Sequence, residues 1–351
     1  MNHAPPADKA ADNLRYPFDT VPEPGELIEV ATGIFWLRMP LPFSLNHINL
    51  WLLEEKDGWT IVDTGLANDE IKTLWRHIFA HHLKGKPVTR VIVTHLHPDH
   101  VGLAGWLTRK WGVELHMSRT DYLMCKNLVV DTGRPPPAEA LKFYRAAGFS
   151  EPELDHYAKR FGVFGEYVSR MPDIFHRLRD GDSLGIGGRE WHVVVGSGHA
   201  PEHVCLYGPE AKVLLSGDQI LPRISSNVSV HPTEAYENPL RDWLDSCARL
   251  RATLPGDVLV LPAHNEPFYG LHARLEALIA GHEEGLAKLL ELLAEPKRAV
   301  DVFPALFKRA VDRDLFFMAT GESLAHLRCL LARGDVTIER DDKGVDWYRR
   351  G

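Results

Sequence analysis

The chain has 351 residues, of which 44% are hydrophobic and 25% charged, and its formal net charge is -8 at pH 7. This composition is ordinary for a globular protein and excludes a largely disordered chain. The acidic total argues against broad binding to a phosphate backbone, so nucleic acid is a disfavoured partner.

Neither a membrane nor an oxidising compartment is indicated. No run of about 18 apolar residues occurs, and the polar amino terminus lacks the apolar stretch of a secretory signal. The cysteines have no Cys-x-x-Cys spacing, which disfavours a zinc knuckle or a redox pair. They are Cys125, Cys205, Cys247 and Cys329. We therefore predict a soluble, cytoplasmic protein with reduced thiols and no membrane partner.

Short β-rich pieces open the structured part of the chain. Residues 1–25 are rich in Pro, Ala and Asp and predict a flexible lead-in. From 27 to 65, apolar runs separated by turn residues predict a meander of strands. Residues 71–82 then predict a helix, 89–95 a buried strand, and 98–112 a second helix whose first residue is a proline suited to the first turn.

Helices then interrupt the β pattern. Residues 119–171 have helical spacing broken by glycine and proline, which predicts a helical insertion. Strand patterns resume between 182 and 217 and again at 257–264, separated by an amphipathic helix at 240–254. Two β-rich halves therefore flank helices.

The last part of the chain has a pattern of its own. A long helix at 270–293 ends before a proline, which places a domain boundary just before residue 295. Two helical patterns, about 299–310 and 321–333, are followed by a hairpin. Helix, helix and hairpin predict a small winged-helix-like domain at 295–351.

A group of titratable residues directly follows the buried strand at 89–95. The pattern His-x-His-x-Asp-His consists of His95, His97, Asp99 and His100. Alternate positions that leave a strand project to one side, and imidazole and carboxylate groups suit zinc and similar metals. Single histidines at strand ends are usually packed or surface residues, but this density of ligands is hard to explain without a metal.

Three later segments also end an apolar run with a candidate ligand. They are "VVVGSGH" with His199, "VLLSGD" with Asp218 and "VLVLPAH" with His264. Nearby, His203 is an alternative to His199. An earlier run, "IVDTG", carries Asp63.

In this order, the motifs resemble those of the metallo-β-lactamase superfamily: a strand followed by Asp, His-x-His-x-Asp-His, His, Asp and His. The resemblance covers about residues 27–290 and implies an α+β fold, an αββα sandwich with metals at one edge of its two sheets. We therefore expect a catalytic domain at 26–294, with the helical insertion at about 119–171 and the winged-helix-like domain after it. The superfamily pattern favours His199 over His203.

The resemblance also implies a ligand set. The expected ligands are His95, His97 and His199 for one metal and Asp99, His100 and His264 for a second, with Asp218 as the bridge between them. Asp63 would orient ligands rather than bind metal, and the alternative is a turn-forming aspartate before a glycine. The expected cofactors are two divalent cations, with zinc favoured, although manganese and iron accept the same ligands.

Metal-dependent hydrolysis is the implied chemistry. Two metals about 3.5 to 4 Å apart hold a bridging hydroxide at neutral pH and polarise the group that it attacks. Asp99 would relay a proton to the leaving group and Asp218 would complete the site, so both are catalytic candidates. A bridging aspartate resembles the glyoxalase II-like, lactonase and phosphodiesterase branches rather than true β-lactamases. We expect a small ester, thioester or lactone as the substrate.

Two regions are candidates for substrate contact. The stretch 40–54 resembles a hairpin over the active site of relatives with a carboxy-terminal winged helix, and Phe43, Asn46 and His47 lie within it. A turn packed by Phe43 is equally consistent. The aromatic residues of the insertion at 119–171 suit a pocket wall or lid, but helical packing is the commoner reason for such spacing.

Two other functions stay open. A phosphodiesterase or single-strand ribonuclease would use the same metals, although the mixed charges of the C-terminal domain are typical of a solvated face. A binding or assembly protein with structural metals is the non-enzymatic alternative. The oligomeric state also stays open, and a homo-oligomer is among the alternatives.

Overall fold

The computed structural model describes residues 14–313 and 315–351, so the first 13 residues of the predicted lead-in lie outside it. Just after them, Leu14 is buried and Arg15 pairs with Tyr269 through two main-chain hydrogen bonds. The described part of the lead-in therefore packs against the body of the protein.

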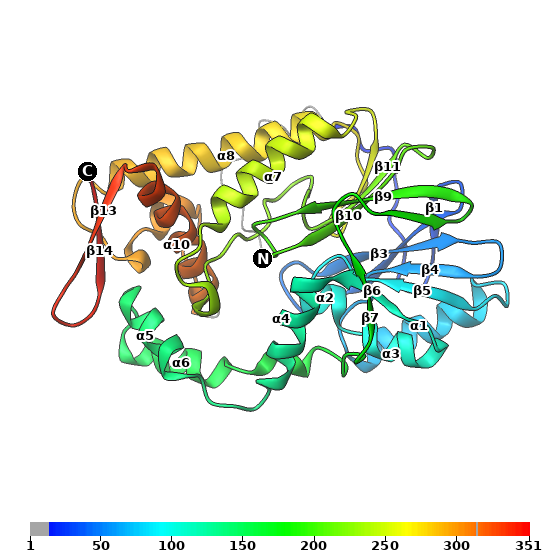
Figure 1. Cartoon of the computed structure of the whole chain (residues 1–351), viewed down its shortest axis with the longest axis horizontal. Helices are drawn as coiled ribbons and strands as arrows, with labels where there is room; N and C mark the ends of the chain where they lie inside the picture. The colour runs from blue at the N-terminus through cyan, green and yellow to red at the C-terminus, as the bar shows by residue number, and fades with distance from the viewer. Residues whose placement is uncertain (1–13, 314) are drawn as a thin grey trace.

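Two β-sheets face each other in the right-hand part of the molecule in Figure 1. Among the described residues, the larger sheet has seven strands in the order β1 to β7, and the smaller has five in the order β12-β11-β10-β9-β8. The larger sheet consists of β1 (Ile28–Ala31), β2 (Ile34–Pro40), β3 (His47–Glu54), β4 (Trp59–Val62), β5 (Val88–Ile92), β6 (Leu115–Ser118) and β7 (Phe175–Leu178). The smaller consists of β8 (Ser183–Ile186), β9 (Arg189–Gly196), β10 (His203–Gly208), β11 (Val213–Gly217) and β12 (Leu259–Pro262).

Helices cover the outer faces of both sheets. The helices α1 and α3 lie below the larger sheet, and α7 and α8 lie above the smaller one (Figure 1). The helices are α1 (Asp69–His81), α2 (Pro98–Val101), α3 (Ala104–Trp111), α4 (Arg119–Val130), α5 (Ala138–Ala146), α6 (Glu151–Arg160), α7 (Pro239–Thr253), α8 (Leu271–Leu292), α9 (Phe303–Leu306) and α10 (Phe316–Arg333). The predicted αββα sandwich is thereby confirmed.

The space between the sheets is filled by large apolar side chains. Trp36 and Trp51 of the larger sheet lie in one buried cluster with Trp191 and Leu215 of the smaller sheet. Burial of such side chains contributes roughly 1.5–3 kcal/mol each, so the two sheets are held together mainly by this layer.

The strand directions bring several loops to one edge of the sandwich. The strands β4 and β5 are parallel, as are β11 and β12. Parallel neighbours end at the same side of a sheet, so the loops that follow each pair lie together. These loops carry Asp63, His95, Asp218 and His264.

The helix predicted at 98–112 is divided into α2 and α3. The break falls at Gly102, where a Cβ atom would lie 2.4 Å from the carbonyl oxygen of Gly65. The next amide, of Leu103, donates to that oxygen at 3.1 Å. The helix is therefore interrupted where the backbone lies close to the loop after β4, and only glycine fits there.

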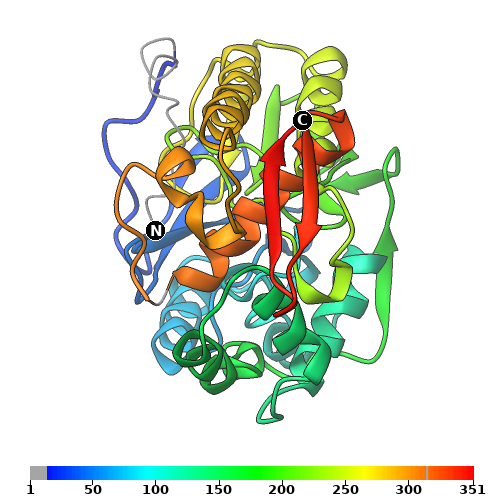
Figure 2. The ribbon, with the colours of Figure 1, turned by 90° about the vertical axis from the view of Figure 1, so that its left-hand side faces the viewer.

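The C-terminal segment packs against the predicted insertion. The hairpin of β13 (Val336–Arg340) and β14 (Asp346–Arg350) lies in front of α10, with α5 and α6 below (Figure 2). The rings of Phe149 and Phe316 are 5.1 Å apart, and Tyr144 belongs to the same cluster. Aromatic residues of the insertion thus pack against α10, and the winged-helix comparison stays a prediction.

One apolar core continues from the smaller sheet into the C-terminal segment. Leu289 of α8 belongs to the same buried cluster as Val260 of β12 and Leu327 of α10. The short helical turns η2 (Val163–Glu166), η3 (Pro232–Glu234) and η4 (Ala299–Asp301) complete the structure. In the part of the chain that the structure describes, no helix is both long and apolar enough to span a bilayer.

Candidate metal centre

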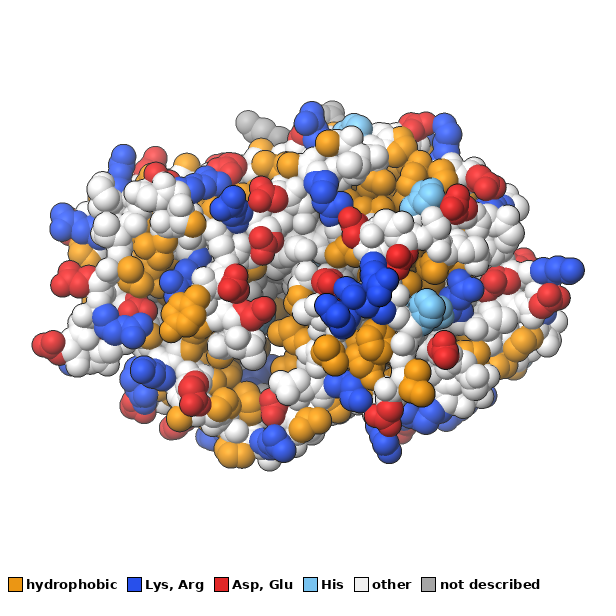
Figure 3. All heavy atoms as spheres, viewed as in Figure 1, with side chains coloured by type: hydrophobic (Ala, Val, Ile, Leu, Met, Phe, Trp, Pro, Cys, Tyr) orange, Lys and Arg blue, Asp and Glu red, His pale blue; other side chains and the backbone are white. Residues whose placement is uncertain are grey.

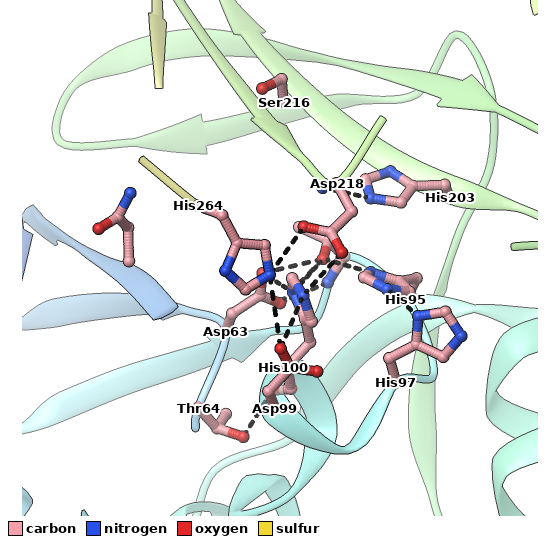
Figure 4. Close-up of polar contacts among 12 residues, drawn as sticks. Asp63, Thr64, His95, His97, Asp99, His100, His203, Ser216, Asp218 and His264 are labelled. Atoms are coloured by element: carbon pink, nitrogen blue, oxygen red, sulfur yellow. Dashed lines mark hydrogen bonds and ion pairs between the residues drawn. The ribbon is translucent and has the colours of Figure 1, made fainter. Parts of the chain in front are cut away.

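The predicted ligands meet at the edge where the strand-end loops converge, and Figure 4 labels all of them except His199. His95 follows β5, His97 occupies the N-cap position of α2, and His100 lies within α2. The loops after β9, β11 and β12 contribute His199, Asp218 and His264.

One group of ligand atoms lies within 4.8 Å of one another and comes from His95, His97, His199 and Asp218. The Nε2 atom of His95 is 2.9 Å from Nδ1 of His97 and 3.3 Å from Nε2 of His199. Asp218 Oδ2 is 3.4 Å from Nε2 of His199. Three imidazole nitrogens and a carboxylate oxygen are a ligand set typical of zinc.

A second group, also within 4.8 Å, comes from Asp99, His100 and His264. The Nε2 atom of His264 is 3.5 Å from Asp99 Oδ2 and 3.4 Å from Asp218 Oδ1. His100 Nε2 is 3.6 Å from Asp218 Oδ2. The Asp218 carboxylate therefore faces both groups.

The unpartnered atoms of these residues fit a metal. Within residues 14–313 and 315–351, the buried His100 Nε2 and Asp218 Oδ1 have no hydrogen-bond partner. Leaving such atoms buried and unpaired costs free energy, on the order of 1–3 kcal/mol each. A divalent cation among the ligands would complete their coordination, so the residues present fit the group that the motif implies.

The electrostatics agree with this fit. Burial lowers the pKa of His95 and of His97 well below the usual histidine value, and the neighbouring imidazoles lower it further. Burial also acts to lower the pKa of His100, but Asp63 and Asp218 raise it well above that value. Neutral imidazoles are the form that binds metals, and a cation would replace the proton held between His100 and the carboxylates.

Asp63 lies behind His100. Its Oδ2 atom is 2.8 Å from His100 Nδ1, and its Oδ1 atom accepts from the Thr94 amide at 2.8 Å. Asp63 has a φ of 61°, a left-handed conformation that is uncommon outside glycine. The carboxylate holds Nδ1 of His100 and thereby aims Nε2 toward the other ligands.

Main-chain carbonyls orient two further histidines. His199 Nδ1 donates to the carbonyl oxygen of Asn227 at 2.7 Å, and His264 Nδ1 donates to that of His47 at 2.8 Å. A carbonyl can only accept, so each Nδ1 carries the proton and each Nε2 is left for a metal.

Supporting residues that the motif pattern did not single out lie just behind the ligands. His203 Nε2 accepts from the Asp218 amide at 3.0 Å, and burial lowers the pKa of His203 to about 3. Asp121 accepts from the amides of Leu96 and Glu202 at 3.0 and 2.9 Å, which ties the two histidine loops together. The only sequence signal for His203 is its nearness to His199, and no spacing distinguishes Asp121.

The candidate substrate contacts lie at the turn between β2 and β3. Phe43 and Asn46 are exposed there. His47 Nε2 accepts from the Asn265 amide at 2.9 Å, and burial, with Arg38 nearby, lowers the pKa of His47 to about 3. The His47 ring thus supports the loop that carries His264, and contact of the three residues with substrate stays a prediction.

The sandwich and its cluster of ligands define a class, the metal-dependent hydrolases of this fold. A family model of the metallo-beta-lactamase superfamily matches residues 44–264, and a model of the metallo-beta-lactamase-like C-terminal domain matches residues 286–351. The chain belongs to the metallo-β-lactamase superfamily.

Individual relatives agree with this assignment. The crystal structure of a beta-lactamase domain protein from Burkholderia ambifaria is similar over 98% of this chain and 100% of that chain, with 41% identity and a TM-score of 0.89. The probable metallo-hydrolase YqjP of Bacillus subtilis (strain 168) is 25% identical over 86% of this chain and 93% of that protein. The acyl-coenzyme A thioesterase MBLAC2 of Gallus gallus is 26% identical over 68% of this chain and 80% of that protein. The protein is a metal-dependent hydrolase.

Proposed function

We propose that this protein binds two divalent cations, with zinc favoured by the many imidazole ligands, and hydrolyses a small-molecule thioester. The observation that carries the proposal is the position of Asp218. Its Oδ2 atom lies 3.4 Å from His199 Nε2, and its Oδ1 atom lies 3.4 Å from His264 Nε2. A carboxylate that faces two ligand groups favours two cations over one.

When bound, the cations lower the pKa of water and polarise the carbonyl under attack. The chain's own residues hold the geometry. Asp63 and the carbonyl oxygens of His47 and Asn227 keep three imidazoles oriented through their Nδ1 atoms. Fixed ligands need no rearrangement during the reaction, which lowers the barrier.

Asp99 is suited to proton transfer. Its side chain is 20% exposed, compared with 10% for Asp218, so it is the more accessible carboxylate of the two. An accessible carboxylate next to the reacting carbonyl can take a proton and deliver it to the departing sulfur or oxygen.

The relatives support a thioester in particular. The acyl-coenzyme A thioesterase MBLAC2 spans most of this chain, and by its name it cleaves the bond between an acyl group and a thiol. We extend the reaction class, and not the particular acyl group, to this protein. Esters and lactones have the same reacting carbonyl and are the nearest alternatives.

The charges of the C-terminal segment give little support to the ribonuclease alternative. Arg298, Arg333 and Arg340 form ion pairs with Asp301, Glu283 and Asp346. Acidic and basic side chains are interspersed over this half of the molecule (Figure 3). Paired charges offer a nucleic-acid strand little net attraction.

A substrate screen tests the proposal. Protein reconstituted with zinc, manganese or iron is given acyl-coenzyme A thioesters, a chromogenic ester, a lactone, a phosphodiester and short RNA. We expect release of free thiol to be the fastest reaction, and Asp218→Ala to abolish it. Faster cleavage of the phosphodiester or RNA, or thiol release that Asp218→Ala leaves unchanged, would contradict the proposal.

A further inference from the structure

The segment between β11 and α7 connects the metal centre to the C-terminal helices. On the side of the metal centre, the carbonyl oxygen of Asn227 accepts from His199 Nδ1 at 2.7 Å. Ser226 Oγ donates to the main-chain oxygen of Asp218. Two proposed ligands therefore rest on this segment.

On its other side, the segment is held by α10. Asn227 Nδ2 donates to Glu322 Oε2 at 2.8 Å, and Ser229 Oγ donates to Asn227 Oδ1 at 2.5 Å. The Val230 amide donates to the carbonyl oxygen of Gly321 at 3.0 Å. Both polar ends of the Asn227 side chain are thus occupied, which restricts where its main-chain carbonyl can lie.

The backbone of α10 lies directly against the segment. A Cβ atom on Gly321 would be 2.8 Å from the Cβ and Oγ atoms of Ser229 and 3.1 Å from the carbonyl oxygen of Val230. No larger residue fits without displacing one of the two. Glycine next to Glu322 therefore permits the close approach that the hydrogen bond to Asn227 requires.

Helix α8 holds the start of the same segment. The buried Arg274 donates to the carbonyl oxygens of Leu221 and Ile224. His282 Nε2 is 3.0 Å from Ser225 Oγ. Residues 221–230 of the segment are therefore held by α8 and α10.

We propose that Glu322 is a positioning residue of the metal centre: through Asn227 it sets the orientation of His199, so that α10 completes the site. This inference rests on the proposed metal centre. An imidazole ligand is oriented by the acceptor of its other ring nitrogen, and Glu322 holds the residue that supplies that acceptor.

The burial of Glu322 agrees with a positioning role. Its side chain is 3% exposed, and burial raises its pKa to about 7, although the hydrogen bond from Asn227 acts to lower it. A buried carboxyl group is unfavourable for folding compared with an apolar residue of similar size. Stability alone is therefore a poor explanation for Glu322 in the interior.

The simplest competing account is that Glu322 only fastens α10 to the sandwich. Two variants separate the accounts. Glu322→Ala removes the acceptor for Asn227 Nδ2, whereas Glu322→Gln keeps an oxygen that can accept the same hydrogen bond. Leu324→Ala is the matched control, because Leu324 is buried on the same helix within the hydrophobic core. Its truncation should destabilise α10 and keeps the Glu322 carboxylate as the acceptor for Asn227 Nδ2.

The experiment measures zinc affinity by competition with a chromogenic chelator, and the thermal midpoint of each full-length variant. We expect Glu322→Ala to weaken the binding of one zinc ion by about tenfold. We expect Glu322→Gln to stay within about threefold of the wild type, since the hydrogen bond is kept. Leu324→Ala should lower the thermal midpoint and leave zinc affinity unchanged.

The inference is overturned if Glu322→Ala binds zinc as the wild type does. It is also overturned if Leu324→Ala weakens zinc binding as much as Glu322→Ala at a similar loss of thermal stability. His199→Ala separates this outcome from a failure of the metal centre itself. If His199→Ala still binds two zinc ions with wild-type affinity, the proposed ligand set is wrong; if it loses zinc while Glu322→Ala does not, only the role of Glu322 is wrong.

Discussion

Two clusters of buried polar residues lie on either side of the segment between β11 and α7, and they differ in how their atoms are partnered. In the metal centre, His100 Nε2 and Asp218 Oδ1 have no hydrogen-bond partner among the described residues. In the cluster between α8 and α10, His282 Nδ1 is 3.3 Å from His326 Nε2, and His326 Nδ1 donates to the carbonyl oxygen of Glu322 at 2.9 Å.

Unpartnered buried atoms, as in the metal centre, indicate a site for a ligand. Buried residues that partner one another, as between α8 and α10, support the fold. Burial lowers the pKa of His282 to about 3 and that of His326 to about 4, the same direction in which it shifts the pKa of His95 and of His97. The pKa direction alone therefore does not identify a metal site. The candidate metal centre differs in that the unpartnered His100 Nε2 faces the Asp218 carboxylate at 3.6 Å, whereas the rings of His282 and His326 face each other and accept or donate within the chain.

The largest effect is expected at Asp218. Asp218→Ala removes the carboxylate that faces both ligand groups and should lower kcat/KM for thioester hydrolysis by about 10³-fold or more. Ser323→Ala is the control on α10, away from the proposed ligands, because the buried Ser323 hydroxyl has no hydrogen-bond partner within the described chain. Kinetics together with zinc content check both variants. An equal loss of activity and zinc content in Asp218→Ala and Ser323→Ala would contradict the distinction between the two clusters.

The next effect is acid destabilisation of the internal cluster. The folded pKa of His326, about 4, lies below the usual value of 6.5, so the unfolded chain binds the proton first. The stabilising contribution is complete above pH 6.5 and is lost as the pH falls through about 4, by roughly 3 kcal/mol. The ring of His282 faces that of His326 and has a pKa of about 3. It therefore also lowers the free energy of unfolding as the pH falls.

Urea unfolding of metal-free protein at pH 7, 5.5 and 4 measures this loss. His326→Gln stays neutral at all three values, so the stability difference between wild type and variant should shrink as the pH falls. Groups shared by both proteins cancel in that difference. A difference that is constant with pH would mean that His326 has the same pKa in the folded and the unfolded chain.

A smaller effect is expected at Asp63. Asp63→Asn puts an amide where the carboxylate accepts from His100 Nδ1 and from the Thr94 amide. Loss of such a partner typically costs 10–100-fold in metal affinity or activity, less than the loss of a ligand. Zinc competition and kcat/KM measure it. An effect as large as that of Asp218→Ala would indicate that Asp63 binds metal directly.

The smallest effect is expected at the cysteines, which belong to neither cluster. All four are buried, and burial raises the pKa of Cys125 and of Cys247 to about 12. Since the thiolate is the reactive form, a thiol-reactive disulfide reagent should label fewer than about one cysteine per folded chain and leave hydrolysis unchanged. Labelling is followed by absorbance before and after denaturation. Rapid labelling of the native protein, with loss of activity, would place a thiol near the site.

The sequence by itself determined the sandwich and pointed to the ligands. A buried strand such as β5 reads as a continuous apolar run, and the residues just after it are forced to the edge of the sheet. Four of the predicted ligands are therefore close in sequence because one turn and one short helix carry them. The loops of His199, Asp218 and His264 share the same signal, an apolar run that ends in a ligand residue.

Only the tertiary structure determined which residues support the ligands. Glu322 and His326 are one helical turn apart on α10, a spacing that in sequence resembles a solvated helix face, yet both are buried against Asn227 and His282. Asn227 and Glu322 are 95 positions apart. Their contact depends on how α8 and α10 pack together on the sandwich. Packing of that kind is set by the shapes of many apolar side chains at once, and no local spacing encodes it.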